Sequence, residues 1–353
     1  MALEPNDSRV QAARRRLDRL WRRGCDFLGS ELAIMGGAMT WLSDRNLVAA
    51  ISNGGGFGVL ACGSMTPDQL DREIAATAKR TDRSFGVNLI TMHPDLEALI
   101  STCGRRRVSH VALAGGLPPR DAIARIKDAG AKVMCFAPTL GVARKLVRSG
   151  VDAIIVEGME AGGHTGPVST AVLAQEILPH LDEVPVFIAG GIARGDAILM
   201  YLEMGAAGCQ LGSRFVCATE SIAHPAFKKA FLRANARDAV LSVQVDPRFP
   251  VIPVRALANA GTRRFVEVQH EVIARFRAGE LSKQEAQLEI ERFWAGALRR
   301  AVIDGDVETG SVMAGQSVGM VTKEQPSAEI LAELLDQAVA ALVDRHRFEA
   351  PEE

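Results

Sequence analysis

One histidine and two carboxylates lie in a glycine-rich stretch near the middle of the chain. The stretch VEGMEAGGHTG, residues 156–166, holds Glu157, Glu160 and His164 among four glycines. Glycine lets a backbone adopt positive φ and approach a ligand closely, and a histidine held in such a loop can move a proton near neutral pH. The stretch therefore predicts a site of proton transfer. The alternative is a flexible loop that carries its histidine by chance.

Two more glycine-containing segments follow short apolar runs further along the chain. Gly191 comes after the run 184–189, and Gln210-Leu211-Gly212-Ser213 ends the run 207–211. Backbone N–H groups freed by glycine can bind a phosphate, and parallel barrels often bind phosphate between the last two strand ends. The two segments together predict a phosphate site, whereas each alone is also consistent with a tight turn.

Three polar side chains interrupt the apolar runs: Asn88, Glu157 and Gln210. Burying an amide or carboxylate without a partner costs on the order of 2–7 kcal/mol. Either the three satisfy one another, or they face a polar ligand. A flat heterocycle with a phosphate tail would satisfy these side chains and both glycine segments.

The elements that would position these residues form a regular alternation. Eight short apolar runs, each followed by a segment with helical spacing, predict a TIM-like (β/α)8 barrel. An open doubly wound sheet is the alternative, and it is less favoured because no GxGxxG follows the first run. The expected strands cover residues 32–35, 57–60, 85–90, 108–113, 131–136, 151–157, 184–189 and 207–211.

The remaining chain divides around this barrel. We expect an Arg-rich helical arm over residues 1–30, which covers one end of the barrel or, alternatively, lies on a membrane surface. The expected barrel spans residues 31–219. A C-terminal helical subdomain over 220–310 includes an amphipathic helix over 290–303 and lies near the barrel mouth or forms an oligomer contact. Residues 311–353 are a glycine-rich turn and a final helix that begins near residue 326.

Composition excludes several classes of partner. The formal net charge is −1, aromatic residues make up 5% of the chain, and no apolar run is long enough for a membrane span. We therefore expect a small-molecule substrate, with no nucleic acid and no membrane span. The six cysteines have no zinc-ligand spacing, so no metal is expected, and free thiols favour a cytoplasmic location. A homodimer is left open.

The motifs resemble the nitronate monooxygenase family (2-nitropropane dioxygenases) and, in the same superfamily, the flavin-dependent enoyl-acyl-carrier-protein reductases. The similarity rests on five motifs in order between residues 33 and 225, with weaker similarity to about 325. They are Gly37-Ala38-Met39, Gly86-Val87-Asn88, EGMEAGGH from Glu157 to His164, Ala189-Gly190-Gly191-Ile192, and QLGSRF from Gln210 to Phe215.

This resemblance implies a TIM-like barrel with noncovalently bound FMN. It implies His164 as the catalytic residue that faces the substrate. The residues that it places against FMN are Gly37, Ala38, Met39, Asn88, Glu157, Gly162, Gly191, Gln210, Leu211, Gly212 and Ser213. One departure is Gly36, because family members often carry glutamine before the first loop.

The expected function is oxidation of an alkyl nitronate with O2 by an FMN-dependent oxidoreductase. His164 would deprotonate a neutral nitroalkane or hold the anion. The alternatives are an NAD(P)H-dependent enoyl-acyl-carrier-protein reductase, which the segment 310–316 favours, and an NADH:quinone reductase. A flavin-binding barrel without turnover is a further alternative, and it leaves the position of His164 unexplained.

Overall fold

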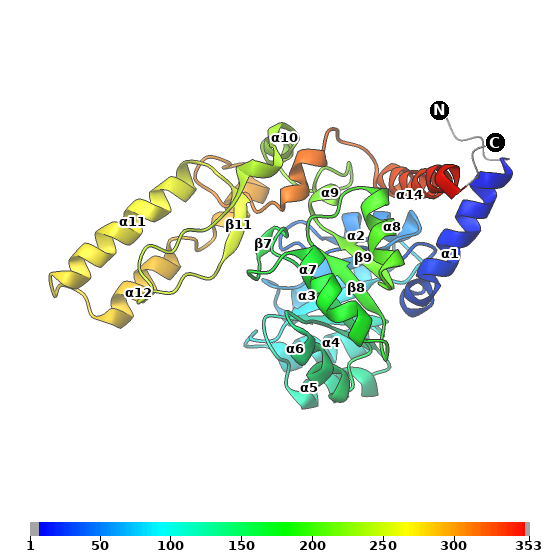
Figure 1. The fold of residues 1–353 in the computed structure, drawn as a ribbon. Helices are drawn as coiled ribbons and strands as arrows, with labels where there is room; N and C mark the ends of the chain where they lie inside the picture. Colours follow the sequence, from blue (N-terminus) through cyan, green and yellow to red (C-terminus); the bar gives the residue numbers. More distant parts are fainter. Residues whose placement is uncertain (1–6, 350–353) are drawn as a thin grey trace.

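A computed structural model describes residues 7–349 of the chain. Its centre is a closed barrel of eight parallel strands, which confirms the predicted TIM-like barrel (Figure 1). The barrel closes where β1 pairs with β9, through Met35 opposite Gln210. The strands are β1 Ile34–Gly36, β2 Phe57–Ala61, β3 Gly86–Ile90, β4 His110–Ala114, β5 Lys132–Phe136, β6 Ala153–Glu157, β8 Val186–Ala189 and β9 Gly208–Leu211.

Helices follow the strands around the outside of the barrel. Apolar side chains of the strands and helices form one large core between the two layers. Most of these helices are short, because each crosses back only along the height of the barrel. They are α2 Arg45–Asn53, α3 Pro67–Ala78, α4 Leu96–Arg105, α5 Arg120–Asp128, α6 Leu140–Arg148, α7 Thr170–Ile177, α8 Gly195–Glu203 and α9 Ser213–Val216, with a 3₁₀ turn η1 Leu178–His180 after α7.

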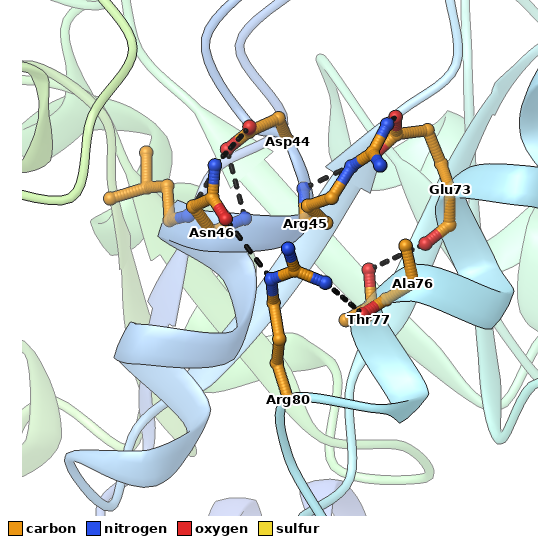
Figure 2. Close-up of polar contacts among 8 residues, drawn as sticks. Asp44, Arg45, Asn46, Glu73, Ala76, Thr77 and Arg80 are labelled. Atoms are coloured by element: carbon orange, nitrogen blue, oxygen red, sulfur yellow. Dashed lines mark hydrogen bonds and ion pairs between the residues drawn. The ribbon is translucent and has the colours of Figure 1, made fainter.

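A polar network fixes the start of α2 and joins it to α3 (Figure 2). The Asp44 carboxylate caps α2 by accepting the backbone N–H of Asn46 at 3.0 Å. Arg45 forms an ion pair with Glu73 of α3, and Arg80 donates from Nε to Oδ1 of Asn46 at 3.1 Å. Because the first barrel loop ends at Asp44, this network also anchors one wall of the barrel mouth.

The N-terminal helix α1, Ser8–Leu28, closes the opposite end of the barrel. Its last turn places Phe27 in the barrel interior, and the backbone carbonyl of Phe27 lies 2.8 Å from Nε2 of the buried His110. The final helix α14, Ser327–Glu349, packs on α1, α8 and α2. Helices α1 and α14 lie within the two segments in which helices were expected, and residues 1–6 and 350–353 of those segments lie outside the described chain.

The region 220–310 differs from the predicted helical subdomain, because it also contains two strands. Together with β7, Gly163–His164, they form a three-stranded antiparallel sheet in the order β10-β11-β7. These strands have two to four residues, too few for an alternating pattern to stand out in the sequence. The elements are α10 Pro225–Arg233, η2 Ala236–Asp238, β10 Ala239–Leu241, β11 Val254–Leu257, α11 Ala260–Arg277 and α12 Lys283–Arg292.

The predicted helix over 290–303 is wrong. Helix α12 ends at Arg292, and Gly296 has a φ of +70°, which breaks a helix. A short α13, Ala297–Arg299, and a π-helical turn η3, Arg300–Asp304, follow it; a 3₁₀ turn η4, Gln316–Met320, comes before α14. Figure 1 shows α11 and α12 side by side in an arm that extends away from the barrel.

Candidate functional site

The carboxyl ends of the barrel strands surround one cavity of about 390 Å³, called here the mouth cavity. Every site residue predicted from the sequence lines it, although these residues come from the ends of five barrel strands and the segments that follow them. The predicted residues in its wall are Gly37, Ala38, Met39, Asn88, Glu157, Gly162, His164, Gly191, Gln210, Leu211, Gly212 and Ser213. The fold therefore brings together residues separated by up to 176 positions (213 minus 37).

One side of the mouth cavity is built from glycine backbone. Gly191 has a φ of +71°, which favours glycine strongly. A Cβ at Gly162 would lie 2.5 Å from the backbone nitrogen of Gly315, so that position has no space for a side chain. A Cβ at Gly212 would meet only the Met39 sulfur, at 3.7 Å. Close packing therefore explains Gly162, whereas Gly212 leaves open space in the cavity.

Glu160 connects the glycine-rich loop after β6 with two neighbouring segments. The sequence analysis did not predict this role. Its Oε2 accepts the backbone N–H of Thr170 at 2.9 Å and the hydroxyl of Thr170 at 2.8 Å. Its backbone carbonyl accepts the N–H of Gln316 at 2.9 Å. A side chain at Gly191 would contact Glu160, with Cβ atoms 3.0 Å apart. Glu160 thus ties the β6 loop to α7 and to the C-terminal turn.

The floor of the cavity carries the three polar side chains that interrupt the strands. Asn88 is 7% exposed and donates from Nδ2 to the Ala112 carbonyl at 3.1 Å. Gln210 is 9% exposed. Within residues 7–349, the side chains of Glu157 and Gln210 have no hydrogen-bond partner, and burial raises the pKa of Glu157 to about 7. The alternative that the three side chains satisfy one another therefore does not hold for these two, which both line the cavity.

His164 is held by strand pairing in place of the expected loop. It lies in β7, and its Cα is paired with that of Val254 in β11. The neighbouring Thr165 N–H donates to the Pro253 carbonyl at 3.2 Å. Burial lowers the pKa of His164, so the neutral imidazole dominates at neutral pH and one ring nitrogen can accept a proton. The imidazole also lines two further cavities beside the mouth cavity.

Arg255 is a site residue that the sequence analysis missed. It lies in β11 opposite Gly163 and is 4% exposed. Its Nε donates to the Met159 carbonyl at 2.9 Å, and its Nη1 donates to the Ala239 carbonyl at 2.6 Å. The guanidinium thus joins the loop after β6 to the small sheet. An arginine inside the apolar run 251–257 was the available signal.

The first barrel loop is closed by a serine. The Ser43 hydroxyl accepts the N–H of Met39 and donates to the Gly37 carbonyl, both at 2.9 Å. Gly36, where the resemblance departs from the family pattern, lies inside β1. A Cβ there would be 2.5 Å from Cδ1 of Ile51, so packing against α2 explains the glycine.

The side-chain groupings of residues 7–349 bear on metal sites, and their helices bear on membrane spans. No group of three or more His, Cys, Asp or Glu side chains in this range is placed to hold a metal ion. Within the same residues, every helix is too short or too polar to cross a bilayer.

Comparison with known proteins gives one family and several close relatives. A family model described as nitronate monooxygenase matches residues 23–103 and 97–337. The chain is 31% identical over 346 residues to the (3aS,4S,5R,7aS)-5-hydroxy-7a-methyl-1-oxo-octahydro-1H-indene-4-carboxyl-CoA dehydrogenase of Mycobacterium tuberculosis, with 90% of this chain and 96% of that protein covered. It is 27% identical over 359 residues to a nitronate monooxygenase of Paraburkholderia phytofirmans, covering 87% and 92%.

One solved structure is similar to this chain over nearly its whole length. FabK from Thermotoga maritima superimposes with a TM-score of 0.83 at 34% identity, and the match covers 93% of this chain and 99% of that one.

Proposed function

We propose, from the premise that this chain belongs to the nitronate monooxygenase family, that it is an FMN-dependent oxidoreductase. One observation carries the proposal: a single cavity joins a glycine-lined wall, a polar floor and the imidazole of His164. Such convergence of polar groups in one pocket is typical of a ligand site. FMN supplies the electron-transfer chemistry when bound.

The residues of the mouth cavity fit FMN. Glu157 and Gln210 offer unpaired hydrogen-bonding groups at the floor, as the edge of a flat heterocycle requires. Gly191 and Gly212 place backbone in the wall of the cavity, where its N–H groups could bind a phosphate. Ser213 keeps its hydroxyl hydrogen available, because its oxygen already accepts the Gly315 N–H at 3.0 Å. Gly191, Gly212 and Ser213 would hold the phosphate, and Glu157 and Gln210 would hold the ring.

His164 would move the proton in the reaction. Its neutral imidazole can accept a proton from the carbon next to an electron-withdrawing group, and the resulting imidazolium can return it. Arg255 does not touch the cavity; it would hold the backbone that carries His164. The strand pairing of β7 with β11 would fix the direction of the imidazole.

Two substrate classes follow from this chemistry. A thioester, with proton transfer at its α-carbon, comes first, because the 31% identical relative is named for a CoA ester and the nitronate monooxygenase relative is 27% identical. NAD(P)H would be a co-substrate if the thioester is reduced. Oxidation of a nitronate with O2, which the sequence alone ranked first, is the second candidate and has the family name in its favour.

The kinetics of wild type and of His164→Ala distinguish these two substrate classes. If the protein oxidises nitronates, the variant should lose about 10²–10⁴-fold in kcat/KM on the neutral nitroalkane and much less on the pre-formed nitronate. If it acts on thioesters, wild type should consume NADH or NADPH with a 2-enoyl thioester and leave nitronate unoxidised. Steady-state kinetics on all three substrates gives the answer.

His180→Ala is the matched control, because His180 is exposed in η1 and lies outside the mouth cavity. Protein that contains no flavin, and acquires none from excess FMN, would contradict the proposal itself. Equal losses in the two histidine variants would remove His164 from the mechanism. A cytoplasmic location and a homodimer stay predictions.

A further inference from the structure

A second cavity, called here the outer chamber, adjoins the mouth cavity on the side of the small sheet. It measures about 490 Å³ and lies between β10, β11, α11 and the turn before α13. Apolar side chains form most of its wall. They include Val240, Val243, Val254, Ala256, Phe265 and Trp294.

The outer chamber and the mouth cavity share part of their walls. His164, Leu298 and Met313 line both spaces. A molecule whose reacting group contacts the imidazole therefore has the chamber on the other side of the same side chains. Cavities of roughly 300–1,000 Å³ hold drug-sized ligands, whereas a nitronate of two or three carbons would leave most of the chamber unfilled.

Aromatic rings give the chamber a well-defined inner wall. The Trp294 ring lies 5.4 Å from that of Phe265 and 4.9 Å from that of Phe293, measured between centroids. Phe265 is 2% exposed, so its packing holds the group in place. At the rim, Val243 and Ile252 are 52% and 66% exposed. A ligand in the chamber would cover apolar surface that the chain alone leaves in water.

A third space, called here the side groove, meets His164 from the barrel side. It measures about 370 Å³, and Leu117, Phe136 and Val142 are in its wall. It is the competing place for an apolar ligand. The outer chamber is larger and has a wall backed by three packed aromatic side chains, whereas Phe136 is the sole phenylalanine, tyrosine or tryptophan in the wall of the side groove. These differences favour the chamber for a bulky group.

We propose that the outer chamber is the subsite for the hydrocarbon body of the substrate, a chain or ring system on the order of ten carbons whose reacting group lies at His164. This inference rests on the proposed function, because it takes the mouth cavity as the reaction site. It applies equally to a thioester and to a nitroalkane, since both would present a hydrocarbon body to the same wall. Valine, phenylalanine and tryptophan at this wall would then set substrate size.

The test measures binding without turnover. The protein as purified is titrated by calorimetry with acetyl-, hexanoyl- and decanoyl-CoA in one arm, and with nitroethane and 1-nitrohexane in the other. If the chamber takes the hydrocarbon body, affinity should rise about fourfold per added methylene in the series that binds, until the chamber is full. The arm that shows this rise identifies the substrate class.

Substitutions locate the bound chain. Ala295→Trp and Val243→Trp each place a large ring in the chamber, and both residues are exposed, so the fold should tolerate the change. In each variant, the increase in affinity from the shortest to the longest ligand should be at least about tenfold smaller than in wild type. Affinity for the two-carbon ligand, acetyl-CoA or nitroethane, should stay unchanged. Leu117→Trp, in the side groove and 50% exposed, is the matched control and should preserve the gain.

Three outcomes overturn the inference: no dependence on chain length in either arm, no binding in either arm, or loss of the gain in Leu117→Trp alone. Melting temperatures of the three variants show whether each is folded. If affinity rises with chain length but the protein shows no FMN-dependent catalysis, the proposed function is wrong and the assignment of the chamber stands. If the protein catalyses the reaction but affinity does not depend on chain length, the proposed function stands and the assignment of the chamber is wrong.

Discussion

At the scale of single residues, Glu157 is a carboxyl group that the fold places in a desolvated position. It lies on the cavity floor without a hydrogen-bond partner within residues 7–349, and burial raises its pKa from 4.5 to about 7. A carboxyl group with a raised pKa binds its proton more tightly in the folded chain than in the unfolded one. Its contribution to stability is therefore lost as pH rises through the window from about 4.5 to about 7.

This sign gives a measurable prediction for the apoprotein. Between about pH 5 and about pH 8, ionisation of Glu157 should cost at most about 3 kcal/mol of unfolding free energy. Glu157→Gln should remove that part of the pH dependence, because the amide does not ionise. Urea unfolding of wild type and variant at the two pH values measures it. Parallel pH profiles for the two proteins would show that the carboxyl is not desolvated.

Gly212 offers a clean test of the cofactor wall. Its φ is −109°, which any residue can adopt, and an added side chain would point into open cavity. Gly212→Val should therefore raise the Kd for FMN by at least about tenfold, some 1.4 kcal/mol, with little change in stability. Gly191→Val is a poorer test, because its φ of +71° would also strain the backbone.

Fluorescence titration of apoprotein with FMN measures this effect. Gly141→Val in α6 is the matched control, since that glycine is exposed and distant from the mouth cavity. An unchanged Kd in Gly212→Val would move the cofactor away from the loop after β9.

At the scale of elements, the pairing of β7 with β11 decides where His164 points, and Arg255 secures it. Arg255→Met would leave the carbonyls of Met159 and Ala239 without the guanidinium donor. We expect a loss of about 1–3 kcal/mol in stability for each carbonyl left buried and unpaired. Arg255→Lys should recover part of this, because one ammonium cannot reproduce the planar fork of donors.

Hydrogen exchange separates a positioning role from a purely structural one. In Arg255→Met, the amides of β7 should exchange faster than in wild type, while those of β3 and β4 should change only by the global loss of stability. Arg263→Met is the control, because Arg263 is exposed on α11. Equally faster amide exchange in all strands would show that Arg255 stabilises the fold as a whole and has no specific effect on the loop after β6.

At the scale of the whole molecule, the barrel and the arm have separate hydrophobic cores of unequal size. The barrel core unites strands, outer helices, α1 and α14, whereas the arm of α11 and α12 has a small cluster of its own. That cluster is built from Phe249, Phe265, Val272, Ile273, Ala286 and Ile290. Because local opening free energy follows the buried contacts that are lost, the arm should open well below the global unfolding free energy.

Native-state hydrogen exchange tests this prediction directly. Amides of α11 and α12 should exchange at least about tenfold faster than those of β3 to β6 at neutral pH, and a bound long-chain ligand should slow the arm selectively. Since the outer chamber lies at the base of the arm, opening of the arm would also admit substrate. Equal protection in arm and barrel would show that the two cores unfold as one.

The sequence by itself determined that the chain forms a barrel and which residues lie together at its mouth. Eight apolar runs set the strand number, and parallel strands must place their carboxyl ends at one edge, so the positions of Asn88, Glu157 and Gln210 along the chain were enough to group them. The glycine segments could be placed beside them for the same reason. These inferences depend on local periodicity and on a topology with few alternatives.

Only the tertiary structure decided what surrounds that site. Strand β7 has two residues, and its partner β11 lies about ninety positions away, so no local pattern predicts that the pair holds His164. Arg255 reads in the sequence as an interruption of an apolar run, and its role appears only when the Met159 carbonyl lies against it. The outer chamber is likewise formed by packing between distant segments. Such contacts depend on long-range packing, which neither residue composition nor spacing encodes.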